Sequence, residues 1–140
     1  MNDNQNGAGG HTDNSSKLIL MVDDAQTIRD AGRSFLTKAG YTVVMAEDGF
    51  AALEIVWAQR PDLIFMDVNM PRLNGYDTTE AIKQNEELRD IPIVMLSGED
   101  SVFDKARGMF SGASEYLVKP FSRENLIATV ERHLLNNSRG

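Results

Sequence analysis

The stretch Leu63-Ile64-Phe65-Met66-Asp67 is an unbroken apolar run that ends in a carboxylate. Apolar side chains at consecutive positions predict a strand that is buried on both faces, as in a parallel sheet covered by helices on both sides. Similar short runs extend this prediction to a set of strands at Leu18 to Val22, Tyr41 to Ala46, Leu63 to Met66, Ile93 to Leu96 and Glu115 to Val118. Asp67 therefore directly follows a buried strand.

Amphipathic segments lie between these runs. Their apolar stripes predict helices between Ile28 and Ala39, around Leu53 to Trp57, around Ala81 and Ile82, from Val102 to Phe110, and from Leu126 to Leu134. Gly40 is well placed to end the first helix as its C′ residue, and Pro61 is expected to terminate the second. The third helix is expected to begin near Tyr76 and to fade in the polar stretch from Gln84 to Asp90.

Strands and helices thus alternate strictly along the chain, with short connections between them. This pattern predicts an α/β fold: a flavodoxin-like (βα)5 doubly wound parallel sheet with the strand order 2-1-3-4-5. In that order the first and third strands are neighbours, and their carboxyl ends carry Asp23-Asp24 and Asp67. Such folds bind ligands in the crevice at this switch point.

The polar residues at the strand ends suggest a site for a divalent metal and a phosphoryl group. Asp23, Asp24 and Asp67 would repel one another unless a cation neutralises them, which favours Mg²⁺. Ser97 ends the fourth strand and Lys119 precedes Pro120 after the fifth, so that a hydroxyl and an ammonium join the carboxylates. An aspartate in this position can act as a nucleophile that carries a phosphoryl group.

Each of these residues also has a structural interpretation. Asp23 and Asp24 are suited to capping a helix, and Asp67 to a turn that Pro71 and Asn74-Gly75 would complete. Ser97 before a glycine is common loop sequence, and most lysines are solvated. The structural interpretations account for each residue singly but not for their convergence at one sheet edge. A Lys119-Pro120 bond, which can adopt the cis form, would also fix the direction of the lysine.

The composition excludes several classes of function. With 14 Lys plus Arg against 21 Asp plus Glu, the net charge of −7 disfavours a nucleic-acid partner, which would be repelled. The absence of cysteine excludes disulfides and thiolate metal sites. No apolar stretch approaches the roughly 20 residues that span a bilayer, and no signal sequence follows Met1. We expect a cytoplasmic protein without membrane insertion.

A chain of 140 residues falls in the range of one domain. Residues 1–16 are rich in Asn and Gly and lack large apolar side chains, so we expect a disordered N-terminal tail. The domain is expected to span residues 17–135, and residues 136–140 to form a short C-terminal tail. Because no effector domain follows, we expect a stand-alone protein that signals through a protein surface.

The motifs at the strand ends closely resemble those of the receiver domain of bacterial two-component response regulators. The resemblance covers residues 17–135 and is carried by Val22-Asp23-Asp24, Met66 to Pro71, Asn74-Gly75, Leu96-Ser97-Gly98 and Tyr116 to Phe121. It implies that Asp67 is the phosphoacceptor, which takes its phosphoryl group from a phosphohistidine on a sensor histidine kinase of the chemotaxis type. It also implies a signalling protein that catalyses only its own phosphotransfer and dephosphorylation.

The resemblance implies a role for each further site residue. Asp24, Asp67 and the backbone carbonyl of Asn69 would ligate Mg²⁺, with Asp23 acting through a metal-bound water. Lys119 would hold one phosphoryl oxygen. Ser97 would move to donate to another oxygen, and Tyr116 would turn inward as the aromatic switch. The downstream partner would bind the face formed by the fourth helix, fifth strand and fifth helix. The protein itself would be a monomer or a phosphorylation-dependent dimer.

Further residues bear on the lifetime of the phosphoryl group and on the kind of receiver that the chain resembles. Asn69 and Glu99 are expected to flank the path of the attacking water and to allow hydrolysis of the phosphoryl group within seconds to minutes. Gly98 stands where this family more often has Ala, which adds backbone freedom beside Ser97. The two histidines, His11 and His133, have no ligand context. The segments Asp48 to Leu53, Pro71 to Tyr76 and Phe103 to Gly108 look like those of type IV pilus twitching-motility regulators.

Three other functions remain open. An aspartyl-nucleophile phosphatase of the haloacid dehalogenase type needs a second Asp as general acid, where this chain has Asn69. A flavodoxin-like electron carrier would set its FMN phosphate against Asp23-Asp24, a repulsive arrangement. A receiver-like adaptor could work without phosphorylation, although no site residue is missing. We rank the phosphorylatable receiver first and the constitutive adaptor second.

Overall fold

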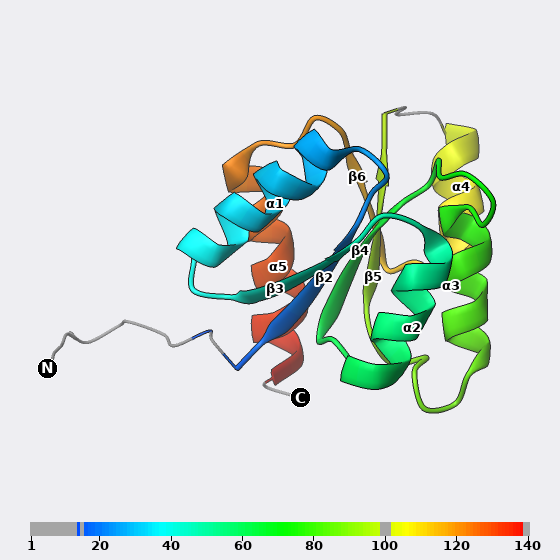
Figure 1. Cartoon of the computed structure of the whole chain (residues 1–140), viewed down its shortest axis with the longest axis horizontal. Helices are drawn as coiled ribbons and strands as arrows, with labels where there is room; N and C mark the ends of the chain where they lie inside the picture. Colours follow the sequence, from blue (N-terminus) through cyan, green and yellow to red (C-terminus); the bar gives the residue numbers. More distant parts are fainter. Residues whose placement is uncertain (1–13, 15, 99–101, 139–140) are drawn as a thin grey trace, which may run out of the picture.

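The structure, a computed structural model, describes residue 14 and residues 16–98 and 102–138. Within this part of the chain, one sheet contains five parallel strands in the order β3-β2-β4-β5-β6 (Figure 1). The strands are β2 (Leu18–Val22), β3 (Thr42–Ala46), β4 (Leu63–Asp67), β5 (Ile93–Ser97) and β6 (Glu115–Val118). Counted along these strands, the order is 2-1-3-4-5, which confirms the predicted doubly wound fold.

Helices cover both faces of the sheet, as Figure 1 shows. They are α1 (Gln26–Lys38), α2 (Gly49–Gln59), α3 (Gly75–Gln84), α4 (Val102–Ser111) and α5 (Arg123–Ser138). α1 and α5 pack side by side on one face, and α2, α3 and α4 line the other. The sheet is therefore the middle of three layers.

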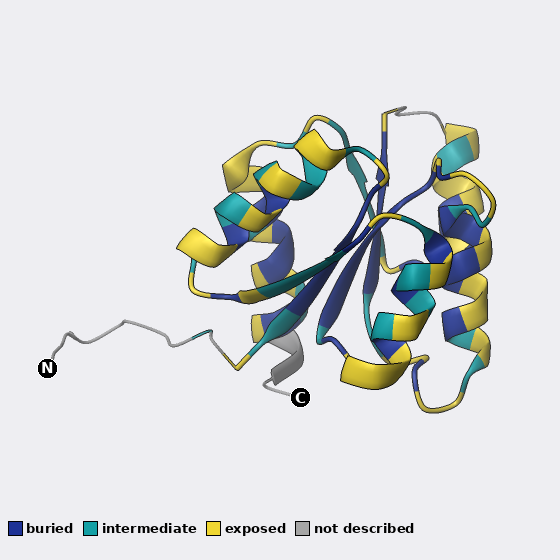
Figure 2. Cartoon of the chain, in the orientation of Figure 1, coloured by how far each residue is buried: buried dark blue, intermediate teal, exposed yellow. Residues whose placement is uncertain are grey.

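The strands alternate their side chains between two hydrophobic cores, one on each side of the sheet. Within β4, Ile64 and Met66 enter the core under α2 and α3, whereas Leu63 and Phe65 enter the core under α1 and α5. Figure 2 shows the central strands buried along their length. Because both faces are covered, every residue of β4 must be apolar until the strand reaches its end, which explains the unbroken run in the sequence.

The predicted helix ends are largely confirmed. Gly40 has a φ of 99° directly after the C-cap Ala39 of α1, as a C′ glycine requires. α2 ends at Gln59 and its C-cap Arg60 precedes Pro61. α5 differs from the prediction, because it continues to Ser138 and so includes part of the expected C-terminal tail. No glycine or proline follows Leu135 until Gly140, and Asn136 and Asn137 are weaker stop signals that the helix passes through.

Part of the expected N-terminal tail contacts the domain. The Asn14 side-chain amide donates to the Ala39 carbonyl at 3.1 Å, one of the carbonyls that the end of α1 leaves without a helical partner. Of that predicted tail, residues 1–13 and 15 lie outside the described residues. Among the helices described, none is long and apolar enough to cross a membrane.

Candidate functional site

The ends of β2 and β4 bring the predicted carboxylates together. Val22 of β2 is in register with Met66 of β4, so Asp23 and Asp67 follow side by side at the same edge. One carboxylate oxygen from each of Asp23, Asp24 and Asp67 lies within 4.8 Å of the others. Asp23 is fully buried and Asp67 is 1% exposed, whereas Asp24 faces solvent. The structure thus confirms that the three acidic residues form one cluster at the switch point.

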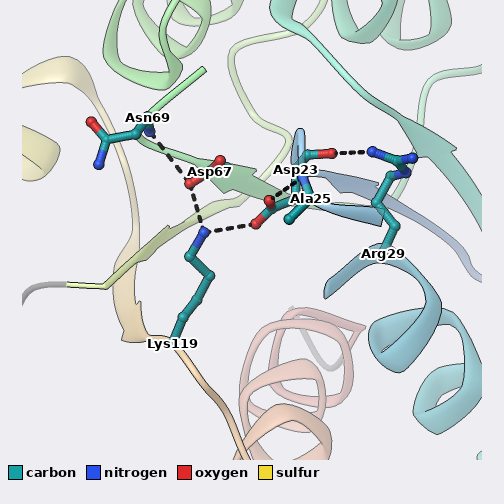
Figure 3. Close-up of polar contacts among 6 residues, drawn as sticks. All are labelled: Asp23, Ala25, Arg29, Asp67, Asn69 and Lys119. Atoms are coloured by element: carbon teal, nitrogen blue, oxygen red, sulfur yellow. Dashed lines mark hydrogen bonds and ion pairs between the residues drawn. The ribbon is translucent and has the colours of Figure 1, made fainter. Parts of the chain in front are cut away.

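Lys119 joins this cluster from the loop after β6. Its Nζ donates to Asp23 Oδ2 at 2.9 Å and to Asp67 Oδ1 at 3.0 Å, so the ammonium lies between the two buried carboxylates (Figure 3). The Lys119 N–H donates to the Ser97 carbonyl at 2.6 Å, which joins this loop to the end of β5. The Lys119-Pro120 bond is cis. The lysine is therefore part of the acidic cluster and not a solvated surface group.

Burial and charge act in opposite directions on these groups. Burial raises the pKa of Asp67 to about 6, with a further contribution from the Asp23 charge, although the hydrogen bond from Lys119 opposes the shift. For Lys119, burial lowers the pKa, but the neighbouring carboxylates of Asp23 and Asp67 outweigh burial and raise it. Lys119 is therefore protonated and positively charged at neutral pH, whereas ionisation of Asp67 is less favourable than that of an exposed aspartate.

One oxygen of Asp67 is left without a partner. Oδ2 of Asp67 is buried and accepts no hydrogen bond from any residue that the structure describes. A buried carboxylate oxygen without a donor is costly and calls for a ligand. The ammonium of Lys119 pairs with two of the three clustered carboxylates, and the carboxylates offer oxygen atoms, the ligands that Mg²⁺ prefers. The residues present therefore fit a hard divalent cation.

Asn69 contacts the phosphoacceptor candidate through its backbone. Its N–H donates to Asp67 Oδ1 at 3.3 Å, while its side-chain amide points away from Asp67 (Figure 3). Gly75, where the loop ends, lies so close to the strand that an added Cβ would stand 2.0 Å from the Asp67 carbonyl oxygen. Asn74-Gly75, predicted as a turn signal, is instead the N-cap and first residue of α3, and its glycine makes a close backbone contact that only glycine permits.

The remaining predicted residues lie at different distances from the cluster. Ser97 ends β5 and is 1% exposed, one strand away from Asp67. Tyr116 lies on β6 in register with Met95 and is partly buried. Glu99 lies outside the described residues, as does His11. His133 is on α5, where its Nε2 lies 2.8 Å from Glu115 Oε1, away from the acidic cluster.

Sequence reasoning missed the residues that hold the loop after β2. Arg29, one turn into α1, donates to the Asp23 carbonyl at 2.7 Å, and the Ala25 N–H donates to Asp23 Oδ1 at 2.9 Å (Figure 3). The N-cap of α1 is Ala25 and has no side-chain cap, so helix capping does not account for Asp23-Asp24. An arginine in an amphipathic helix is usually solvated, which is why the pattern carried no signal for Arg29.

Comparison with known proteins places these features in a family context. The pattern of the response regulator receiver domain family matches residues 19–131. Protein PilG of Pseudomonas aeruginosa is 42% identical over 116 residues, which cover 83% of this chain and 86% of PilG. The chain also matches mycobacterial response regulators MprA, of which it spans about half the length.

Solved structures are similar as well. The chemotaxis protein CheY4 of Vibrio cholerae superposes with a TM-score of 0.81 at 39% identity, covering 84% of this chain and 98% of that protein. The receiver domain of the sensor histidine kinase PA1611 of Pseudomonas aeruginosa has a TM-score of 0.78 at 32% identity. The similarity covers 84% of this chain and 96% of that domain. That structure has a magnesium ion coordinated in its active-site cleft.

Proposed function

Because this chain belongs to the response regulator receiver domain family, we propose that it is a phosphorylatable receiver in which Asp67 accepts a phosphoryl group from a sensor histidine kinase. The observation that carries the proposal is the buried, unpartnered Oδ2 of Asp67 beside the ammonium of Lys119. In the transfer, a carboxylate oxygen of Asp67 attacks phosphorus and forms a P–O bond. The P–N bond to the kinase histidine breaks, and the bonding pair leaves with the imidazole, which takes up a proton.

The charges around Asp67 suit this transfer. Phosphoryl transfer depends mostly on positioning and on neutralising the oxygens that gain charge. Lys119 already lies 3.0 Å from Asp67 Oδ1, so a small shift brings its ammonium to a phosphoryl oxygen. Ser97, at the end of the neighbouring strand, would donate to another phosphoryl oxygen.

Asp24, Asp67 and the backbone carbonyl of Asn69 would hold Mg²⁺, with Asp23 acting through a bound water. The metal supplies positive charge that screens the phosphoryl oxygens from the carboxylates. One oxygen of Asp67 would ligate the cation, and the other would be the nucleophile that attacks phosphorus. The magnesium ion in the cleft of the similar PA1611 receiver domain supports this assignment.

We propose the face of α4, β6 and α5 as the surface that passes the signal on, with Ser97 and Tyr116 as the switch. α4 presents four large apolar side chains to solvent, with Val102 85% exposed, Phe103 75%, Met109 54% and Phe110 90%. In Figure 2 the visible part of this helix is mostly coloured as exposed. Large apolar side chains gathered on one exposed helix favour a protein partner. The proposal places the protein in the cytoplasm, with no nucleic-acid partner and no membrane insertion.

The narrower proposal is a role in type IV pilus twitching motility. Three sequence segments resemble regulators of that system, which supports this proposal. The chain is also 42% identical to PilG over an alignment that includes 86% of PilG. Deletion of the gene in its native host, followed by complementation with the wild type or with Asp67→Asn, tests it. Loss of surface spreading that only the wild type restores is expected. Unchanged spreading would contradict the narrower proposal and leave the receiver assignment standing.

The direct test of phosphorylation is the intact mass of the protein after incubation with acetyl phosphate and Mg²⁺. One added phosphoryl group is expected in the wild type and in the control Asp30→Asn, which changes an exposed aspartate on α1. Asp67→Asn and a sample with chelator should gain nothing. No gain in any sample would favour the constitutive adaptor. Steady hydrolysis of a phosphate ester would instead revive the phosphatase.

The lifetime of the phosphoryl group tests the assignment of Asn69 and Glu99. Asn69 is exposed beside Asp67, and both residues are proposed to flank the path of the attacking water. We expect the phosphoryl group of the wild type to decay within seconds to minutes in Mg²⁺. Persistence for hours would contradict this part of the proposal without affecting the rest.

A further inference from the structure

The loop between β4 and α3, residues 68–74, carries Asn69 past the acidic cluster. At its base, the Gly75 N–H donates to the Val68 carbonyl at 3.1 Å, which closes the loop. Val68 and Met70 are buried, at 3% and 8% exposure, so the core anchors the first half of the loop. The second half, from Pro71 to Asn74, must be held by other contacts.

Arg72 supplies such a contact with the start of α2. Its guanidinium nitrogen lies 2.7 Å from Asp48 Oδ2, and its central carbon lies 5.8 Å from the centre of the Phe50 ring. The other oxygen of Asp48 accepts the Ala51 N–H at 2.8 Å as the N-cap of α2. Asp48 is thus held in place by the helix, and through it Arg72 ties the loop to a rigid element.

The backbone at Arg72 needs this support. Arg72 has a φ of 69°, a left-handed conformation that side-chain-bearing residues other than Asn and Asp rarely adopt. The next residue, Leu73, packs so closely on α2 that a Cβ added to Gly49 would lie 2.8 Å from the Leu73 carbonyl oxygen. A strained residue in a tightly packed loop persists when surrounding contacts hold it. The ion pair and the ring contact of Arg72 are such contacts.

We propose that Arg72 is a positioning residue that orders the 68–74 loop, so that Asn69 is held in place for Mg²⁺ and for phosphorylation of Asp67. This inference rests on the proposed function. A loop that is ordered before the cation arrives loses less conformational freedom on binding, so the affinity is higher. Arg72 itself contacts neither the cation nor the phosphoryl group. Its effect passes through the backbone of the loop.

The chain offers a matched control in Arg60. Arg60 also has a left-handed backbone, with a φ of 50°, lies 4.8 Å from the Trp57 ring centre, and pairs with Glu87 at 3.0 Å. It follows the other end of α2, about 16 Å of helix away from Asp48 at 1.5 Å per residue. Arg60→Ala therefore removes the same kinds of contact from another residue with a positive φ, without touching the loop.

The experiment compares Arg72→Ala, Arg72→Lys and Arg60→Ala with the wild type in the full chain. Mg²⁺ affinity is measured by calorimetry, and amide hydrogen exchange of peptides covering residues 68–74 is measured without metal. Arg72→Ala should weaken Mg²⁺ binding about three- to ten-fold and speed exchange in the loop, since it loses both an ion pair and a cation–π contact. Arg72→Lys keeps the charge but not the planar stack on Phe50. It should therefore restore part of the Mg²⁺ affinity and part of the exchange protection of the loop. Arg60→Ala should match the wild type in both.

The outcomes separate the two proposals. Unchanged loop exchange and Mg²⁺ affinity in Arg72→Ala, or equal shifts in Arg60→Ala, would overturn the positioning role while leaving the receiver assignment intact. If the wild type bound no Mg²⁺, the proposed function would fail, and the positioning role would fail with it. Thermal unfolding of each metal-free variant checks that an affinity loss does not reflect a general loss of fold.

Discussion

The Nζ of Lys119 lies 3.0 Å from Asp67 Oδ1, and this pair joins the loop after the last strand to the central strand of the sheet. The same ammonium contacts Asp23 at 2.9 Å. One cation thus partly neutralises two buried carboxylates that the backbone forces together. The acidic cluster is therefore stable enough to fold and still short of positive charge, which is the condition for attracting a further cation.

Replacing Lys119 by Met should destabilise the metal-free protein. The variant leaves Asp23 and Asp67 buried beside each other without a cation, and removal of one partner from a buried pair costs about 3 kcal/mol. Urea unfolding at pH 7 in chelator measures the change. Lys38→Met, which removes an exposed lysine at the end of α1, is the control and should change the unfolding free energy by less than about 0.5 kcal/mol. Equal effects of the two variants would contradict a structural role for Lys119.

The stability of the metal-free protein should depend on pH through Asp67. Burial raises the pKa of Asp67 to about 6 in the folded state from 3.8, so its contribution is most favourable below pH 3.8 and is lost as the pH rises through 6. Asn does not ionise, so Asp67→Asn removes the loss of stability that ionisation of Asp67 causes. The unfolding free energy of the variant minus that of the wild type should therefore increase by about 2 to 3 kcal/mol between pH 4 and pH 8. A difference that does not change with pH would contradict this interpretation.

Magnesium should stabilise the wild type and lose this effect when Asp67 is replaced. A ligand that binds only the folded state at ten times its dissociation constant stabilises it by about 1.4 kcal/mol, which corresponds to a shift of about 3 to 6 °C in the unfolding midpoint. Thermal melts with and without Mg²⁺, and again after addition of chelator, measure the shift. Asp67→Asn should show little of it. A similar shift in the variant would mean that the cation binds elsewhere.

The fold and the acidic cluster were predictable because they follow from regular patterns. The unbroken run before Asp67 requires a strand covered on both faces, and the alternation of elements then places Asp23 beside Asp67 at one edge. The strand bounds differed at single residues: Asp67 and Ser97 belong to β4 and β5 although they are polar, and Tyr41 precedes β3. Hydrogen bonding of the backbone continues one residue beyond the apolar pattern.

The supporting contacts of the site were not predictable in the same way. Arg29 and Arg72 reach Asp23 and Asp48 across loops, and these contacts depend on side-chain directions that no periodicity encodes. The left-handed backbone of Arg72 is also invisible in the sequence, because such conformations usually require Gly, Asn or Asp. The reactive residues thus follow from the topology, whereas the residues that hold them follow from packing.

Gly98 should tolerate Ala without distortion. A Cβ built there meets no atom of the described residues within 4 Å, so the substitution fits this part of the folded state. It should stabilise the protein by about 0.4 to 1 kcal/mol, because Ala reduces the conformational freedom of the unfolded chain. Chemical unfolding measures this gain. Gly75→Ala is the opposite control and should destabilise strongly, since its Cβ would lie 2.0 Å from the Asp67 carbonyl oxygen. Destabilisation by Gly98→Ala would show that the loop after β5 needs a glycine conformation.

Glu115 links β6 to α5 through Arg132 and His133, within the face proposed for the partner. Its carboxylate pairs with Arg132, and its Oε1 lies 2.8 Å from His133 Nε2. Burial acts to raise the pKa of Glu115, but these two partners outweigh burial and lower the pKa below 4.5. The contribution of Glu115 to stability is therefore present above pH 4.5 and is lost as the pH falls through the lowered pKa.

Glu115→Gln should consequently cost about 1 kcal/mol at pH 7, because two charged hydrogen bonds become neutral ones at a partly exposed site. The cost should shrink toward zero as the pH falls through the lowered pKa of Glu115, because the wild-type carboxylate then becomes neutral as well. Urea unfolding of the wild type and of Glu115→Gln, repeated from pH 7 downward, measures this loss of unfolding free energy. Glu124→Gln, on the exposed first turn of α5, is the control. A cost that persisted at low pH would mean that Glu115 acts through packing, and its charge would then contribute nothing to the attachment of α5 to the sheet.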